Sequence, residues 1–254
     1  MNLPYEPPAT AGGSSASGTV RPDPGVPVVG LAHGSRHPRG ADAIEALMAA
    51  VGATAGVPAR AAYLDLAEPD LEAVATELAH GGHTRAVVVP LLFTAAFHAR
   101  VDVPQEVEAA GRASGLDLVV SDILGTGDDV AEVLRGAIGG AGVEDGLDAV
   151  LFAVGSSRPE ANAAVADLAA RLGGSREGSV RAAFGTCDPR LPDVLAGRSG
   201  HPEAPVALWP LFLADGLLLD PVRRTTQDRG WPLVEPLGAQ AAPLVLARYA
   251  AALA

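Results

Sequence analysis

The sequence predicts an α/β protein built from two tandem, similar domains, each a parallel sheet flanked by helices. The first observation behind this prediction is an internal repeat. Three pairs of segments match at offsets of 122, 120 and 120 residues, namely 28–36 with 150–158, 90–93 with 210–213, and Glu68-Pro69 with Asp188-Pro189. Because the three matches keep nearly one offset, we interpret the chain as a duplicated domain whose halves pair as an internal pseudo-dimer.

Composition is the second observation. The 254 residues are 48% hydrophobic but only 4% aromatic, so the cores must consist of Ala, Val and Leu, which suits helices packed on parallel strands. We expect one domain over 26–140 and a second over 147–254. Residues 1–25 are rich in Pro, Ala, Gly, Ser and Thr and have no apolar run of signal-peptide length. They are expected to form a disordered leader.

Charge and cysteine content exclude several classes of protein. A net charge of −12 argues against a nucleic-acid or anionic-membrane surface, because both require an excess of Lys and Arg. The single Cys187 excludes an intrachain disulfide and a multi-cysteine metal site. No 18 consecutive residues are apolar. We therefore expect a cytoplasmic monomer with neither nucleic-acid nor membrane partners.

The first half alternates between strand and helix patterns. Residues 26–32 form a nearly continuous apolar run, which is typical of a strand covered on both faces. Residues 41–51 carry apolar side chains at helical spacing, and 60–66 return to a strand pattern. Pro69 then opens a helix over 70–80.

The alternation continues to the end of the first half. Residues 86–93 are the strongest strand pattern in the chain. Asp102, with Gln105 three residues later, predicts the capped start of a helix, and 116–121 supply a fourth strand. The order predicts a parallel sheet, and the second half repeats it from Ala149 onward.

Polar side chains follow the first three strands. His33 comes after the first strand, Asp65 and Glu68 after the second, and His98 after the third. Ligands bind outside the carboxyl ends of parallel strands, so these groups are expected to meet at one edge of the sheet.

The second copy lacks these ionisable groups. In the repeat as matched here, they are replaced by uncharged residues: His33 by Gly155, Asp65 by Gly185 and His98 by Leu218. We therefore expect the functional site in the first half.

Two histidines beside carboxylates suit a divalent first-row metal and proton transfer. Neutral imidazole binds Co²⁺, Ni²⁺, Fe²⁺ or Zn²⁺ and accepts protons near neutral pH. A neighbouring carboxylate can orient the ring, complete the metal shell or relay the proton. Two histidines without further dedicated ligands hold a metal loosely, which favours a metal in transit over a structural ion.

Three segments together resemble the sirohydrochlorin chelatases, the class II chelatases of the siroheme and cobalamin pathways. They are Leu31-Ala32-His33-Gly34-Ser35-Arg36, residues 63–69 and residues 89–104. The resemblance covers the chain from about residue 26, because long members of that family also have two tandem halves with one active site.

The resemblance implies ATP-independent insertion of Co²⁺ or Fe²⁺, with Ni²⁺ a further candidate, into a modified tetrapyrrole. The metal is then a substrate, and no permanently bound cofactor is expected. His33 and His98 match the paired histidines that bind the metal and take protons from the pyrrole nitrogens. The family commonly has glutamate where Asp65 stands, so either Glu68 assists or the metal preference differs.

An anionic tetrapyrrole requires local positive charge in this acidic chain. Basic residues follow the first strand and His98, and Ser35 and Thr94 are candidates to hydrogen-bond the substrate's acid groups. The basic set is Arg36, His37, Arg39 and Arg100. We predict Ser35, Arg36, Thr94 and Arg100 as substrate-binding residues.

Two other functions use some of the same residues. A carrier of metal or tetrapyrrole would need the histidine pair without catalysing insertion, although the added carboxylates favour an enzyme. A phosphohydrolase using the histidines and arginine of residues 33–37 would leave the repeat and Glu68-Pro69 unexplained.

Overall fold

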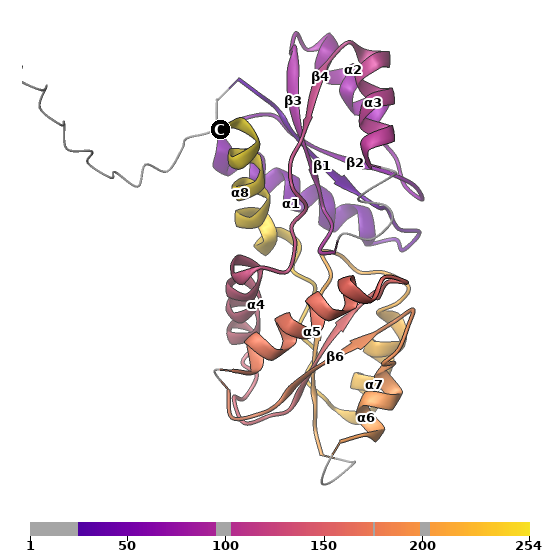
Figure 1. Ribbon diagram of the computed structural model, residues 1–254, viewed down its shortest axis with the longest axis vertical. Helices are drawn as coiled ribbons and strands as arrows, with labels where there is room; N and C mark the ends of the chain where they lie inside the picture. The colour runs from indigo at the N-terminus through magenta and orange to yellow at the C-terminus, as the bar shows by residue number, and fades with distance from the viewer. Residues whose placement is uncertain (1–24, 95–102, 175, 199–203) are drawn as a thin grey trace, which may run out of the picture.

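The computed structural model describes residues 25–94, 103–174, 176–198 and 204–254, and it contains two parallel sheets, one in each half (Figure 1). The first has the strand order β2-β1-β3-β4 and the second the order β6-β5-β7. The strands are β1 (Val28–Ala32), β2 (Ala59–Tyr63), β3 (Arg85–Pro90), β4 (Asp117–Val120), β5 (Ala149–Ala153), β6 (Val180–Phe184) and β7 (Ala207–Pro210). The predicted fold class is confirmed.

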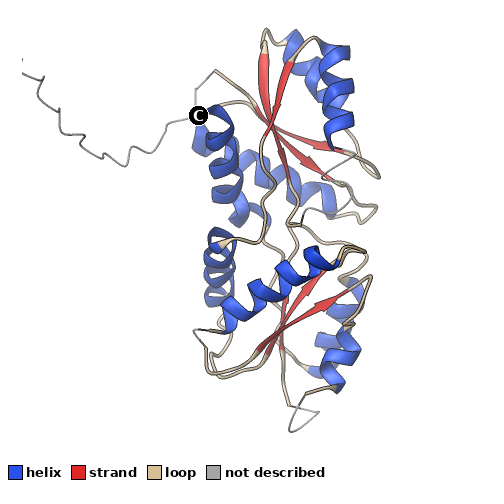
Figure 2. Ribbon diagram, viewed as in Figure 1, coloured by secondary structure: helices blue, strands red, loops and turns tan. Residues whose placement is uncertain are grey.

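Helices connect the strands and cover the sheets (Figure 2). They are α1 (Gly40–Ala55), α2 (Leu71–His80), α3 (Val103–Ser114), α4 (Asp128–Gly140), α5 (Pro159–Gly173), α6 (Leu191–Ala196), α7 (Asp220–Arg229) and α8 (Ala242–Leu253). A short 3₁₀ helix, η2 (Gly238–Ala241), precedes α8. Strand β2 ends three residues earlier than predicted, because the chain turns back and the Tyr63 N–H donates to the Pro69 carbonyl at 3.0 Å.

Alternate residues of each central strand belong to different cores. In β1, Val28 and Ala32 lie in a cluster shared by both halves, whereas Val29 and Leu31 pack with α2 and α3 on the opposite face. All five β1 residues are buried. Burial on both faces explains why the strand has no alternation of polar and apolar residues.

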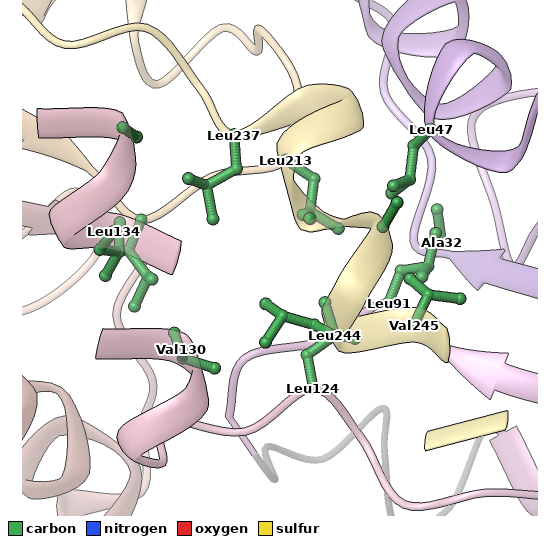
Figure 3. Packing of buried hydrophobic residues seen from close by; sticks show 14 of the residues in the cluster. Ala32, Leu47, Leu91, Leu124, Val130, Leu134, Leu213, Leu237, Leu244 and Val245 are labelled. Carbon is green, nitrogen blue, oxygen red and sulfur yellow. The ribbon is translucent and has the colours of Figure 1, made fainter. Parts of the chain in front are cut away.

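The two halves exchange their last helices. Helix α4 follows β4 of the first sheet but packs against α5 of the second half, and α8 returns to pack on α1 and β3 of the first half (Figure 1). One apolar cluster therefore runs through both halves, with Leu244 and Val245 of α8, Leu124 before α4, and Leu213 and Leu237 in it (Figure 3).

Arg248 of α8 strengthens this exchange. Its Nε donates to the Ile123 carbonyl at 2.9 Å, its Nη2 donates to the Leu124 carbonyl, and its Nη1 lies 2.7 Å from Asp129 Oδ2. One arginine thus ties the returning helix to the segment that crosses between the halves.

The turns after β1 and β5 correct the predicted match between the copies. Their left-handed glycines, Gly34 and Gly155, lie 121 residues apart, and the hydrogen bond from the Asp65 N–H to the His33 carbonyl recurs from the Thr186 N–H to the Val154 carbonyl. His33 therefore corresponds to Val154, and Asp65 to Thr186; the predicted matches to glycines one position away are wrong. Sequence similarity alone left the register open by one residue. Valine and threonine do not ionise near neutral pH, so the second copy still lacks these two groups.

Candidate active site

His33 and Asp65 are neighbours at the carboxyl edge of the first sheet. The Asp65 N–H donates to the His33 carbonyl at 3.0 Å, which extends the pairing of β1 and β2 beyond the strands. Both residues are exposed. Gly34, at φ 94°, permits this approach, because a Cβ there would lie 1.7 Å from the Asp65 carbonyl oxygen. The local backbone thus brings an imidazole and a carboxylate to the same edge.

The loop after β2 surrounds an open hollow of about 370 Å³. Its lining is Tyr63, Leu64, Asp65, Leu66, Ala67, Glu68 and Asp70. Asp65 Oδ1 accepts a hydrogen bond from the Leu66 N–H at 2.7 Å, and Leu66 has a left-handed φ of 63°. Glu68 is exposed in the same loop. Three carboxylates, those of Asp65, Glu68 and Asp70, therefore line one hollow, and Asp70 already caps helix α2 through its bond from the Ala73 N–H.

Tyr63 belongs to this lining, although sequence reasoning did not select it. Its hydroxyl donates to the Ala41 carbonyl at 3.4 Å. Burial raises the pKa of Tyr63, and the nearby carboxylates of Glu45 and Asp42 raise it further. The corresponding residue of the second half is Phe184. The difference between Tyr63 and Phe184 at corresponding positions of the two halves was visible in the sequence and could have identified Tyr63.

Three of the four predicted substrate-binding residues, Ser35, Arg36 and Thr94, lie in two loops of the same edge. Ser35 is partly buried, and its Oγ accepts from the His37 N–H at 3.0 Å, which leaves the hydroxyl proton available to donate. Arg36 is exposed and has no ion pair with any other described residue. Thr94 is partly buried after β3.

Two of the predicted basic residues are paired with acids of the second half, which sequence reasoning missed. Arg39 Nη2 lies 3.3 Å from Asp215 Oδ2, and His37 Nε2 lies 3.6 Å from Asp220 Oδ1. The pair of Arg39 with Asp215 reduces the positive charge that the loop after β1 offers to an anionic substrate. Asp215 was identifiable in the sequence as a charge that follows the repeated segment 210–213.

The family model described as CbiX matches residues 27–140 and 148–241. The chain belongs to the CbiX family. It is 27% identical over 233 residues to the sirohydrochlorin ferrochelatase of Priestia megaterium, covering 87% of this chain and 83% of that relative. It is 25% identical to the sirohydrochlorin ferrochelatase of Bacillus subtilis, covering 78% and 77%. The predicted resemblance to the sirohydrochlorin chelatases is confirmed.

The fold of this CbiX-family chain also matches solved structures. SirB from Bacillus subtilis with Fe³⁺ has a TM-score of 0.72 and 23% identity, covering 90% of this chain and 95% of that one. The CbiX described as the terminal enzyme for biosynthesis of siroheme in denitrifying bacteria has a TM-score of 0.60 and 22% identity, covering 87% and 98%. These likenesses show a shared fold.

Two predicted site residues of the CbiX-family chain, His98 and Arg100, lie outside the described residues. Within the described part of the chain, no three His, Cys, Asp or Glu residues are grouped so that they could hold a metal ion. The histidine pair therefore stays a prediction. No described helix is long and apolar enough to cross a bilayer.

Proposed function

We propose that this protein is a sirohydrochlorin chelatase that inserts a divalent metal ion into sirohydrochlorin without ATP. Co²⁺ and Fe²⁺ are the proposed metals, with Ni²⁺ a further candidate. Family membership supports the reaction class, because curated relatives are named sirohydrochlorin ferrochelatase and sirohydrochlorin cobaltochelatase. The product would feed siroheme or cobalamin synthesis in the cytoplasm.

The observation that carries the proposal is the placement of His33 beside Asp65. A metal ion that enters a tetrapyrrole displaces two pyrrole protons, so the site needs a metal ligand and a proton acceptor close together. An exposed imidazole and an exposed carboxylate on adjoining strand ends provide both.

In the proposed mechanism, His33 and His98 bind the incoming ion and, once they have passed it to the macrocycle, accept the two protons released by the pyrrole nitrogens. Asp65 or Glu68 then passes the protons to solvent through the hollow that both line. Metal²⁺ replaces two H⁺, so the charge of the macrocycle is conserved. Ser35, Arg36, Thr94 and Arg100 bind its acid groups.

The domain arrangement gives one site per chain in this proposal. Residues 26–140 carry the reacting groups, and 147–254 pack against them as the second member of an internal pseudo-dimer. The second copy has Val154 and Thr186 where His33 and Asp65 stand, so it cannot bind or deprotonate in the same way. We propose that the chain acts as a monomer.

The test is insertion kinetics with purified full-length protein. Sirohydrochlorin is mixed with Co²⁺, Fe²⁺ or Ni²⁺ in separate assays, and loss of the metal-free absorbance is compared with reactions without enzyme. His33→Ala and His98→Ala are each expected to lower kcat/KM by about 100-fold or more, since general bases contribute rate factors of that size. The order of rates would rank the metals.

Val154→Ala is the matched control, because it removes the side chain at the corresponding strand end of the second half. It is expected to keep wild-type activity. Binding of sirohydrochlorin without faster insertion would identify a carrier instead, and normal activity in both histidine variants would refute the mechanism.

A further inference from the structure

The loop of residues 33–39 lacks an internal anchor that its counterpart in the second half has. There, Asn162 Oδ1 accepts from the Ser156 N–H at 2.9 Å, and Asn162 Nδ2 donates to the Ser156 carbonyl at 2.8 Å. The residues corresponding to Asn162 and Ser156 are Ala41 and Ser35. An alanine cannot make either hydrogen bond, so the first-half loop must be held in another way.

Contacts from the second half supply that restraint. Arg39 and His37 reach Asp215 and Asp220 at 3.3 and 3.6 Å. The backbone of Asp215 also lies against the start of α1, because a Cβ on Gly40 would be 3.5 Å from the Asp215 carbonyl oxygen. The loop after β7 and the start of α7 therefore meet the loop after β1 and the start of α1 at three places.

Asp215 is itself held firmly within the second half. Its side chain is 14% exposed, and its Oδ1 accepts from Arg223 Nε at 3.0 Å and from Arg223 Nη2 at 2.6 Å. Arg223 is 17% exposed and also pairs with Glu235. The hydrogen bond to Glu235, together with that to Asp215, raises the pKa of Arg223 against the opposing effect of burial. Asp215 thus has one oxygen fixed by Arg223 and presents the other to Arg39.

Asp215 and Arg39 differ in exposure, which indicates that Asp215 is the fixed partner of this ion pair and Arg39 the adjustable one. Arg39 is 62% exposed, so its pairing with Asp215 contributes little to global stability. A weak contact between a firmly held carboxylate and an exposed loop residue acts mainly on where the loop lies. Asp215 stands at the position that corresponds to Ala95 in the first half. The second copy therefore contributes a charge that the first copy does not have.

We propose that Asp215 is a positioning residue for the tetrapyrrole site, which through Arg39 holds the loop that carries Ser35 and Arg36 in the orientation that binds the substrate's acid groups. This inference rests on the proposed chelatase function. Asp215 touches no substrate in this account. In this proposal the second half contributes a residue that positions the substrate-binding loop of the first half.

The position of His33 makes the expected effect selective. His33 is tied to Asp65 through the backbone hydrogen bond of 3.0 Å at the end of β1, and that bond is independent of Asp215. Loss of the Asp215 contact should therefore displace Ser35 and Arg36 while leaving His33 in place. Asp215→Asn is expected to raise KM for sirohydrochlorin about five-fold, as for loss of one partly exposed ion pair, with kcat nearly unchanged.

The kinetic test compares wild type, Asp215→Asn, Arg39→Gln and the double variant in the insertion assay. Because the two residues act through one contact, the double variant should match the larger of the single effects. Arg60→Gln is the matched control, since Arg60 forms an ion pair of 3.0 Å with Glu77 on β2 and α2 of the first half. It should leave KM and kcat unchanged. Independent, multiplying effects on KM, or no effect of Asp215→Asn, would overturn the proposal.

Amide hydrogen exchange gives a second readout that needs no activity. In Asp215→Asn, peptides covering 34–41 are expected to exchange faster than in wild type, whereas peptides covering 154–162 should not change. Unchanged exchange in 34–41 would overturn the positioning role. Absence of insertion by the wild-type protein would instead reject the chelatase function, while the exchange experiment would still test the contact.

Discussion

The loops that follow β1 and β5 have nearly the same backbone but opposite means of support. Gly34 and Gly155 have φ values of 94° and 90°. Ser35 Oγ accepts from the N–H two residues later at 3.0 Å, and Ser156 Oγ does the same at 3.1 Å. The second loop is fixed by Asn162 of its own half, whereas the first is contacted by acids of the other half. The two loops share the turn but differ in the residues that support it.

The different support of the two loops is consistent with different roles for the two halves. Under the proposed function the first loop binds a large anionic substrate and must adapt to it. An ion pair through Arg39, which is 62% exposed, permits such movement more readily than the partly buried side-chain hydrogen bonds of Asn162 do. The second loop carries Val154 where the first carries His33, so the proposed function does not require such movement there. The second half can then stay rigid and hold Asp215 in place while the loop after β1 adjusts to the substrate.

The largest effect is expected from a methyl group at the two turn glycines. In Gly34→Ala the new Cβ would lie 1.7 Å from the Asp65 carbonyl oxygen, a backbone atom that cannot rotate away. We expect a loss of about 3 kcal/mol in unfolding free energy from overlap and positive φ, with a clear fall in kcat/KM as His33 and Asp65 separate. Thermal unfolding and insertion kinetics measure the two effects.

Gly155→Ala is the matched comparison. Its Cβ would meet Cys187 Sγ at 2.8 Å, Phe184 Cβ at 2.9 Å and Thr186 Oγ1 at 3.0 Å. Two of these are side-chain ends that can turn aside, so a smaller destabilisation with normal activity is expected. Equal losses of activity in both variants would show that the second turn also shapes the site.

Much of the fold was predictable because local chemistry determined it. Pro69 and Asp70 indicated the start of α2, and Asp70 Oδ1 accepts from the Ala73 N–H at 2.7 Å as an N-cap. The unbroken apolar run of β1 indicated a strand buried on both faces. Helix α1 extends to Ala55, four residues beyond the apolar pattern of 41–51, and ends where Gly56 adopts a left-handed φ of 71°.

Long-range choices were not predictable from the same patterns. The apolar stripe of α8, including Leu244 and Val245, shows that the helix is buried but not that it covers the first sheet. The rim position of His33 and Asp65 followed from the strand order. The pairing of Arg39 with Asp215 did not, because an acid after a strand is most often a solvated loop charge.

A smaller effect is expected when the second loop loses its own support. Asn162→Ala removes the two hydrogen bonds to Ser156 and a weaker one to Cys187 Sγ at 3.3 Å. We expect about 1 kcal/mol of destabilisation, visible as a lower Tm, and faster amide exchange confined to 154–162. Insertion kinetics should stay at the wild-type level. Reduced activity would contradict the expectation that the loop after β5 contributes to stability and not to insertion.

The smallest effect concerns the opposite, amino-terminal ends of the central strands, where the halves also differ. Ser179 donates to Asp148 Oδ1 through its N–H at 2.9 Å and its hydroxyl at 2.7 Å, whereas the corresponding first-half residues are Pro58 and Pro27. The Ser179 side-chain hydrogen bond lowers the pKa of Asp148 against the opposing effect of burial. The second half should therefore be the more acid-sensitive of the two at this end.

Ser179→Ala tests that expectation through the pH dependence of unfolding. A carboxyl whose pKa is lowered in the folded state contributes stability above its unfolded pKa of about 3.9 and loses it as pH falls through the folded value. The variant should be about 0.5 kcal/mol less stable near neutral pH, and this deficit should shrink as the pH falls below about 4. Ser114→Ala, which removes a hydroxyl bonded to the Ala110 carbonyl at 2.7 Å, should instead give a deficit independent of pH. A pH-independent deficit in Ser179→Ala as well would mean that the hydroxyl contributes by packing alone and that Asp148 does not distinguish the two halves.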